Sequence, residues 1–232
     1  WLTLFPYTTL FRSQLFIDYC KELEENGIIT RTGTIVDATF VDAPKQRNTR
    51  EENKTIKSGD IPEEWKENTP KAKHKLAQKD TDARWTKKNN ETHYGYKNHA
   101  KVDVDSKIIT NYAVTDASVH DSQRFSNFFT EKDKVAYADS AYVGQELPEH
   151  VEAQICEKGY RNHPLTEEQR QNNRRKSKIR CRIEHVFGFM TGSMHGITLR
   201  TIGIKRAKFN IGLTNLIYNI CRYSIISRKS LA

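Results

Sequence analysis

Three acidic residues in this 232-residue chain lie in surroundings that do not favour a charge. Asp37 interrupts a short β-branched run, Asp139 ends a second such run, and Glu184 borders an apolar helical stripe. A carboxylate in such surroundings is unfavourable unless it is paired or bound to a cation. Three carboxylates converging on one edge of a sheet could hold divalent cations and support in-line displacement at a phosphodiester. Composition alone does not select these three from the 29 acidic residues.

Glu184 is expected on a helix that carries a buried face. Apolar residues recur with helical spacing at Ile179, Ile183, Val186 and Met190. Arg180 lies one turn before Glu184, so an i,i+4 contact could orient the carboxylate. The alternatives are a surface ion pair of little energetic weight and a metal ligand whose partners lie elsewhere. This long helix is expected to begin near Thr166, where acids follow a capping residue.

The two aspartates are expected on strands of an α/β protein. Residues 34–41 are apolar on both faces, as in a central strand, and residues 134–139 form a second short buried strand. Residues 94–105 and 108–114 predict an antiparallel hairpin between them. A helix over residues 15–23, ended by Gly27, and an amphipathic closing helix over residues 209–220 complete the pattern.

Residues 43–90 differ from the rest in being polar and interrupted by prolines, which indicates an insertion or an extended loop. Trp65 and Trp85 within it are interpreted either as anchors to the body of the protein or as stacking platforms for unpaired bases.

The charge balance favours an anionic partner. Lys and Arg number 38 against 29 Asp and Glu, giving a net charge of +9, and nucleic acid is the commonest such partner. A basic run is interpreted as either a solvated face or a surface for DNA phosphates, and its candidate contacts are Arg174, Arg175, Lys176, Lys178 and Arg182.

Cysteine spacing and hydropathy exclude other classes. The four cysteines form no CxxC pair or His/Cys cluster, which argues against a zinc site and a disulfide scaffold and favours a reducing cytoplasm. No apolar run has the length of a membrane span, so no membrane partner is expected.

Five ordered motifs carry a resemblance to a known family. They are residues 33–44 (Gly-Thr-Ile-Val-Asp-Ala-Thr-Phe-Val-Asp-Ala-Pro), 93–99 (His-Tyr-Gly-Tyr-Lys-Asn-His), 115–122 (Thr-Asp-Ala-Ser-Val-His-Asp-Ser), 137–142 (Tyr-Ala-Asp-Ser-Ala-Tyr) and 180–188 (Arg-Cys-Arg-Ile-Glu-His-Val-Phe-Gly). Together they resemble DDE-type transposases of the insertion-sequence-five family, within the larger insertion-sequence-four-like group whose catalytic core is RNase H-like.

The resemblance implies an RNase H-like mixed sheet flanked by helices, with a polar insertion after the first strand. It places the three catalytic, metal-binding acids at Asp37, Asp139 and Glu184, and Arg180 in an Arg-x-x-x-Glu element. Asp42 competes for the first position, but five residues along a strand it would face the opposite side. Asp121 competes for the second, and Asp139 is preferred because it ends a buried strand. His120 and His185 are interpreted as groups that order the site or touch DNA, or as structural histidines.

The implied activity is cleavage at the ends of a mobile element followed by strand transfer into target DNA. Mg²⁺ would be the cofactor, with Mn²⁺ as a substitute. The partners would be the terminal inverted repeats, the target DNA and further copies of this chain, in the bacterial cytoplasm at the nucleoid. The competing hypotheses are an RNase H-like nuclease without strand transfer and a catalytically inactive DNA-binding protein derived from a transposase.

The expected organisation has three parts. Residues 1–13 are interpreted as a non-native leader, residues 14–30 as the remnant of an N-terminal helical region, and residues 31–232 as the catalytic domain, with the polar insertion at 43–92. The family usually carries a longer helical N-terminal region that recognises the terminal repeats, so we expect an N-terminally truncated form.

Overall fold

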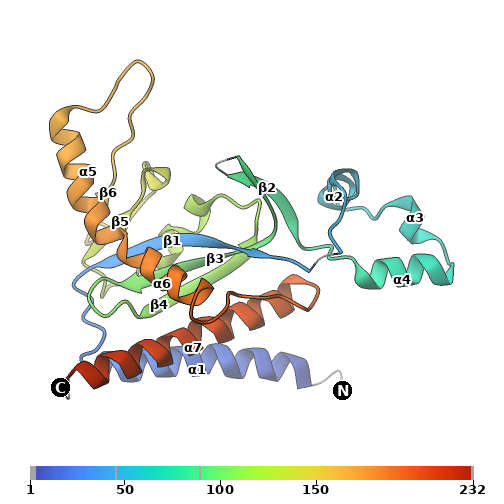
Figure 1. Ribbon diagram of the computed structural model, residues 1–232, viewed down its shortest axis with the longest axis horizontal. Helices are drawn as coiled ribbons and strands as arrows, with labels where there is room; N and C mark the ends of the chain where they lie inside the picture. Colours follow the sequence, from blue (N-terminus) through green and yellow to red (C-terminus); the bar gives the residue numbers. More distant parts are fainter. Residues whose placement is uncertain (1–3, 45, 89, 231–232) are drawn as a thin grey trace.

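A six-stranded mixed sheet occupies the middle of the protein in the computed structural model, which describes residues 4–44, 46–88 and 90–230 (Figure 1). The strands run in the order β2-β3-β1-β5-β6, and β4 pairs with β3. The β1, β3 and β4 pairings are antiparallel, whereas β1, β5 and β6 are parallel. The bounds are β1 Thr34–Asp42, β2 Arg84–Lys88, β3 Glu91–Asp103, β4 Ile109–Asp116, β5 Val135–Ala138 and β6 Glu152–Ile155. The predicted strands around Asp37 and before Asp139, and the predicted hairpin, are confirmed.

Helices flank this sheet, which confirms the predicted α/β class. The main helices are α1 Leu4–Glu25, α5 Glu167–Arg180, α6 Arg182–Thr191 and α7 Ile204–Ser230. Figure 1 shows α1 and α7 lying side by side along the sheet, and the two helices are in contact. Helix α1 ends as predicted, because Gly27 adopts φ +70° and the Ile28 N–H donates to the Leu23 carbonyl. None of the described helices is long and apolar enough to cross a membrane.

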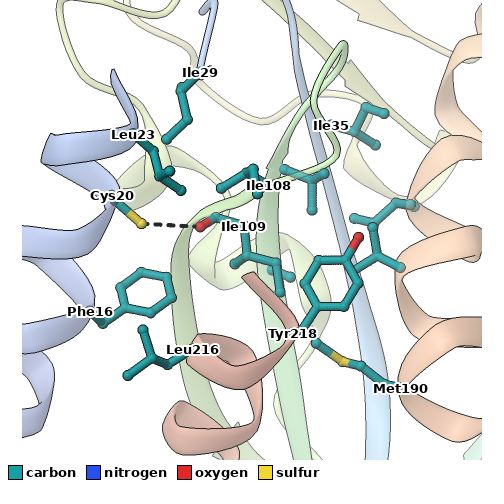
Figure 2. Close-up of a cluster of buried hydrophobic side chains, with 14 of the residues drawn as sticks. Phe16, Cys20, Leu23, Ile29, Ile35, Ile108, Ile109, Met190, Leu216 and Tyr218 are labelled. Carbon is teal, nitrogen blue, oxygen red and sulfur yellow. Dashed lines mark hydrogen bonds between the residues drawn. The ribbon is translucent and has the colours of Figure 1, made fainter. Parts of the chain in front are cut away.

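The largest apolar core lies between one face of the sheet and helices α1, α6 and α7 (Figure 2). Phe16 and Cys20 of α1 meet Ile109 of β4 there, and the Cys20 Sγ lies 3.4 Å from the Ile109 carbonyl oxygen. Ile35 of β1 and Met190 of α6 close the other side of the cluster. Because β1 and α6 share this core, the strand that carries Asp37 and the helix that carries Glu184 are held together by apolar packing.

Two buried asparagines attach α7 to the sheet. The side-chain amides of Asn215 and Asn98, on β3, exchange hydrogen bonds of 2.8 and 3.1 Å. Asn219 accepts from the Ile109 N–H at 2.9 Å and donates to the Ile109 carbonyl at 2.8 Å. Each amide is therefore satisfied despite complete burial, which fixes how α7 lies on the sheet.

The opposite face of the sheet carries buried charges from alternate positions of β3. Lys97 donates to Asp121 at 2.8 Å, and Lys101, whose side chain is 1% exposed, pairs with the buried Asp133. A second apolar cluster, with Val36 and Tyr142 among its members, covers the neighbouring strands on this side. Both faces of β1 are thus covered around Asp37.

The insertion is not an extended loop, because three short helices form within it. They are α2 Arg50–Lys57, α3 Glu63–Lys66 and α4 Pro70–Gln78. Helix α2 begins with a capping box in which Thr49 and Glu52 satisfy each other's backbone N–H groups. Polar helices of this length have no apolar stripe long enough to stand out in the sequence, so composition alone suggested a loop.

Buried groups attach this insertion to the body. The Asp80 carboxylate accepts from the Tyr96 hydroxyl at 2.7 Å and from the Gly203 N–H at 3.1 Å. Trp85 packs against Tyr94, and Trp65 is buried. The interpretation as an anchor to the body is therefore favoured for Trp85, whereas Trp65 is buried within the insertion, with Lys75 and Lys79 against its ring.

The expected long helix is interrupted. Thr166 caps α5 as predicted, with Gln169 completing a capping box, but the helix ends at Arg180 and α6 starts at Arg182. Helix α5 contacts β5, whereas α6 contacts β1. The change at Cys181 lets the two segments follow different strands. Of the expected leader, residues 1–3 lie outside the described residues, and α1 begins at Leu4.

Candidate active site

Asp37 lies in the middle of β1, with its carboxylate largely buried at 17% exposure. Its Oδ1 accepts from the Ala38 N–H at 2.8 Å, and its Oδ2 lies 3.2 Å from Nη1 of Arg180. The expected acid within the first strand is therefore buried and paired.

Arg180 connects the strand acid to the helix acid. While its Nη1 contacts Asp37, its Nη2 lies 3.3 Å from Oε1 of Glu184. The predicted i,i+4 contact is present even though Cys181 separates the two helices. The side chain of Glu184 is 59% exposed, so Arg180 joins one buried and one solvent-facing carboxylate.

Asp139 follows directly after β5, next to β1. Ile35 pairs with Tyr137 in the parallel register, so Asp37 and Asp139 both lie two residues further along adjacent strands. The Asp139 Oδ1 accepts from the Ala141 N–H at 2.7 Å, which caps the 3-10 turn Ser140–Tyr142. Asp139 therefore lies beside Asp37 on the adjacent strand, and its charge acts on Asp37, while Arg180 links Asp37 to Glu184. No described contact joins Asp139 to Glu184.

Burial raises the pKa of Asp37 to about 6. The Ala38 N–H and the Arg180 guanidinium oppose this rise, and the negative charge of Asp139 adds to it. A nearby cation would relieve both the burial cost and the repulsion between the two aspartates. The carboxylate of Asp37 is therefore a group whose environment favours binding positive charge.

Tyr142 lies behind the aspartates as part of the apolar cluster on the opposite face. Its phenol oxygen is buried and has no hydrogen-bond partner among the described residues. Burial raises the pKa of this phenol, and the charges of Asp37, Asp121 and Asp139 raise it further. The hydroxyl is thus neutral and adjacent to the acids.

The two competing acids have other partners. Asp42 is exposed and lies 3.4 Å from Nη2 of Arg47. Asp121 is buried between Lys97 and Lys88, at 2.8 and 3.4 Å. The Lys97 hydrogen bond and charge outweigh the opposing effect of burial and hold the pKa of Asp121 below its usual value. Both contacts are consistent with structural roles for these acids.

The histidines expected near the site do not touch the three acids in any described contact. His185 Nδ1 lies 2.8 Å from Nζ of Lys107, on the turn between β3 and β4. His120 caps the 3-10 turn Asp121–Arg124 through Ser122. His120 therefore has a structural role. His185 lies next to Glu184 on α6, but its partner is Lys107, whereas the partner of Glu184 is Arg180.

The basic run divides into exposed and engaged side chains. Arg174, Arg175 and Lys178 are exposed on α5. Lys176 donates to the Ile155 carbonyl at 2.8 Å, and Arg182 donates to the Val104 carbonyl at 2.9 Å. Three of the five residues expected to contact DNA are thus available on the surface, and two hold neighbouring segments of backbone.

The donor atoms near Asp37 suit a divalent cation, but they do not form a complete set of ligands. Within residues 4–44, 46–88 and 90–230, no group of three or more His, Cys, Asp or Glu side chains is arranged to hold a metal ion. In this structure Glu184 is paired with Arg180. The carboxylate oxygens fit Mg²⁺ or Mn²⁺ chemically, and Glu184 would have to leave Arg180 to act as a third ligand.

Sequence reasoning missed one contact of Arg180 and two further residues. The link from Arg180 to Asp37 spans 143 positions, so no local pattern could reveal it. The charge of Lys88, on β2, opposes the rise in the pKa of Asp37. Lys88 lies in the polar insertion, where lysines are common, so nothing in the sequence marks it. Tyr142 ends one of the motifs quoted above, but its burial beside the acids becomes evident only in the fold.

Comparison with known proteins identifies a family. A family model described as "Transposase DDE domain" matches residues 29–220, which include all three acids and Arg180. No solved structure matches the chain significantly.

Proposed function

Because the chain belongs to the family of transposase DDE domains, we propose that it is a transposase that cleaves DNA at insertion-sequence ends and transfers the 3′ ends into target DNA. The observation that carries this proposal is the double contact of Arg180 with Asp37 and Glu184, next to Asp139. The five motifs support membership of the insertion-sequence-five branch.

In this proposal, Asp37, Asp139 and Glu184 are the catalytic acids and the metal ligands. The family generally depends on divalent metals, and we propose Mg²⁺, with Mn²⁺ as a substitute. When bound, the metal would supply Lewis-acid stabilisation of charge at the phosphate. Asp37 contributes a buried carboxylate that loses its proton at a pH near 6, and Asp139 contributes a second carboxylate from the neighbouring strand.

Arg180 is proposed as a positioning residue. It shares its single positive charge between Asp37 and Glu184 before DNA and metal arrive, and it holds Glu184 to the same guanidinium as Asp37. Since it is bound to both carboxylates, its release from Glu184 would accompany assembly of the site. His185 then has a supporting role through Lys107 rather than through the acids.

DNA is the substrate class that the family implies. We propose that Arg174, Arg175 and Lys178 contact its phosphates from the exposed side of α5, while Lys176 and Arg182 act mainly on the protein backbone. We further propose that residues 31–232 form the catalytic domain, with the 43–92 insertion as part of it, and that several copies assemble on paired ends. We also propose that residues 14–30, which include the C-terminal part of α1, are the remnant of an N-terminal helical region, and α1 contacts α7.

The test compares Asp139→Asn and Glu184→Gln with the parent chain in Mg²⁺. Cleavage of a DNA end and joining of a pre-cut end should both be lost, while DNA affinity stays close to that of the parent. Asp42→Asn is the matched control, because it removes an exposed carboxylate whose ion pair among the described residues is with Arg47. Unchanged cleavage in either acid variant would falsify the assignment. Cleavage without joining would instead indicate a nuclease, and binding without either reaction a non-catalytic DNA-binding protein.

A further inference from the structure

The turn between β3 and β4 carries a cationic cavity that contains none of the three proposed catalytic acids. Its volume is about 170 Å³, and it is lined by Lys107, His185, Phe189, Tyr218, Arg222 and Ile225. These residues come from the turn, from α6 and from α7, so three separate segments converge on it.

Hydrogen bonds hold the walls of this cavity in place. Lys107 adopts φ +60°, and its carbonyl accepts from the Tyr218 hydroxyl at 2.9 Å. Its ammonium donates to Nδ1 of His185 at 2.8 Å. Arg222 donates through Nε to the Ser106 carbonyl at 2.6 Å. The two cationic side chains are therefore positioned by neutral acceptors rather than by carboxylates of the described residues.

No described carboxylate forms an ion pair with Lys107 or Arg222. Burial lowers the pKa of Lys107, and the positive charges of Arg222 and Arg182 lower it further. Arg182 itself lies 3.7 Å from Asp105, at the outer side of the same turn. Several cations held together beside an apolar wall stabilise an anion that enters between them.

We propose that the cationic cavity binds a phosphate group of the DNA backbone, with Lys107 and Arg222 as its main contacts. The choice of DNA as the ligand rests on the proposed function, since the family implies DNA as the substrate. His185 directly follows Glu184 on α6, so a wall of the cavity and one proposed catalytic acid belong to the same helical turn. Lys107 donates to a phosphate oxygen through its remaining N–H groups, and Arg222 through its terminal nitrogens.

The test measures DNA binding without catalysis. A fluorescent duplex of arbitrary sequence is titrated with the full chain in EDTA over a range of NaCl concentrations. Lys107→Asn with Arg222→Gln removes two charges, and Asn tolerates the positive φ at position 107. The matched control, Lys21→Gln with Lys205→Gln, removes two exposed charges elsewhere. The slope of log K against log salt should fall by about one unit in the cavity variant for one lost phosphate contact. In the control it should stay close to that of the parent.

Acetylation of the unmodified chain gives an independent readout. With duplex bound, peptide mass spectrometry should show Lys107 protected and Lys21 still reactive. Equal salt slopes for the cavity variant and the parent, or equal labelling of Lys107 with and without DNA, overturn the proposal. If the double variant does not fold by circular dichroism, Lys107→Asn alone and the labelling decide the question.

These outcomes separate the two proposals. If Lys107 is protected by DNA while the acid variants still cleave, the catalytic assignment fails and the phosphate site stands. If the acid variants lose cleavage while Lys107 labels freely in the complex, the catalytic assignment stands and the phosphate site fails.

Discussion

Replacing Asp37 by Asn should make the metal-free protein more stable at neutral pH. The pKa of this carboxyl rises from 3.8 to about 6, a shift of roughly two units. Each unit corresponds to about 1.4 kcal/mol, so the ionised carboxylate costs the folded state up to about 3 kcal/mol. A buried amide retains part of the desolvation cost, so we expect a gain of about 1 to 2 kcal/mol. For a chain of this size, that raises the midpoint of thermal unfolding by about 3 to 6 °C.

The sign of the pH dependence follows from the raised pKa. Below about pH 4, Asp37 is protonated in both states, and the substitution should have little effect. Between pH 4 and 6 the unfolded chain ionises first, so the parent loses stability relative to the Asn variant. Above pH 6 the difference should be constant.

Differential scanning calorimetry in EDTA at pH 4, 5, 6, 7 and 8 checks this prediction, with Asp42→Asn as an exposed control. The reasoning is refuted if Asp37→Asn lowers the unfolding midpoint at pH 8, or if its effect is the same at pH 4 and pH 8. Adding Mg²⁺ should raise the midpoint of the parent and leave the variant unchanged, because ligand binding to the folded state is stabilising.

Three further predictions concern packing, backbone and DNA contacts. Asp133→Asn leaves the buried Lys101 ammonium without its carboxylate and should cost about 3 to 5 kcal/mol in urea denaturation, against little change for Asp42→Asn. Gly95→Ala should cost more than about 2 kcal/mol, because φ is +153° and a Cβ would lie 2.3 Å from the Val41 carbonyl oxygen. Gly188→Ala, with open space around its Cα, should be neutral or slightly stabilising, so equal losses in the two glycine variants would contradict this argument. Replacing Arg174 and Arg175 by Ala should reduce the salt slope of DNA binding by about two units, and an unchanged slope would identify a solvated face.

The sequence predicted the structure best where a residue's position follows from the periodicity of its immediate neighbours. Asp37 could be placed within one buried strand and Asp139 at the end of another, because β-branched runs bounded by polar turns are local signals. That the two strands are neighbours is known only from the structure. The Arg180–Glu184 contact could be predicted because residues four apart meet on a helix, and the short break at Cys181 does not separate them.

The rest depends on contacts between distant residues. Lys97 and Lys101 appear in the sequence as ordinary polar positions of a strand, but they are buried because Asp121 and Asp133 arrive 24 and 32 residues later. The same holds for Asp80, whose partners on β3 and before α7 turn a polar insertion into a fixed part of the fold. Pairing of this kind has no period, so it can be recognised only once the chain has folded.

The attachment of Asn219 to Ile109 has a consequence for solubility. β4 pairs with β3 on one side, and unpaired N–H and C=O groups on a sheet edge can recruit a strand from another molecule. Asn219 occupies both backbone groups of Ile109 with its own amide, as a neighbouring strand would. A second chain approaching this part of β4 would find its hydrogen bonds already used. The closing helix therefore protects the chain against edge-to-edge aggregation while it completes the core.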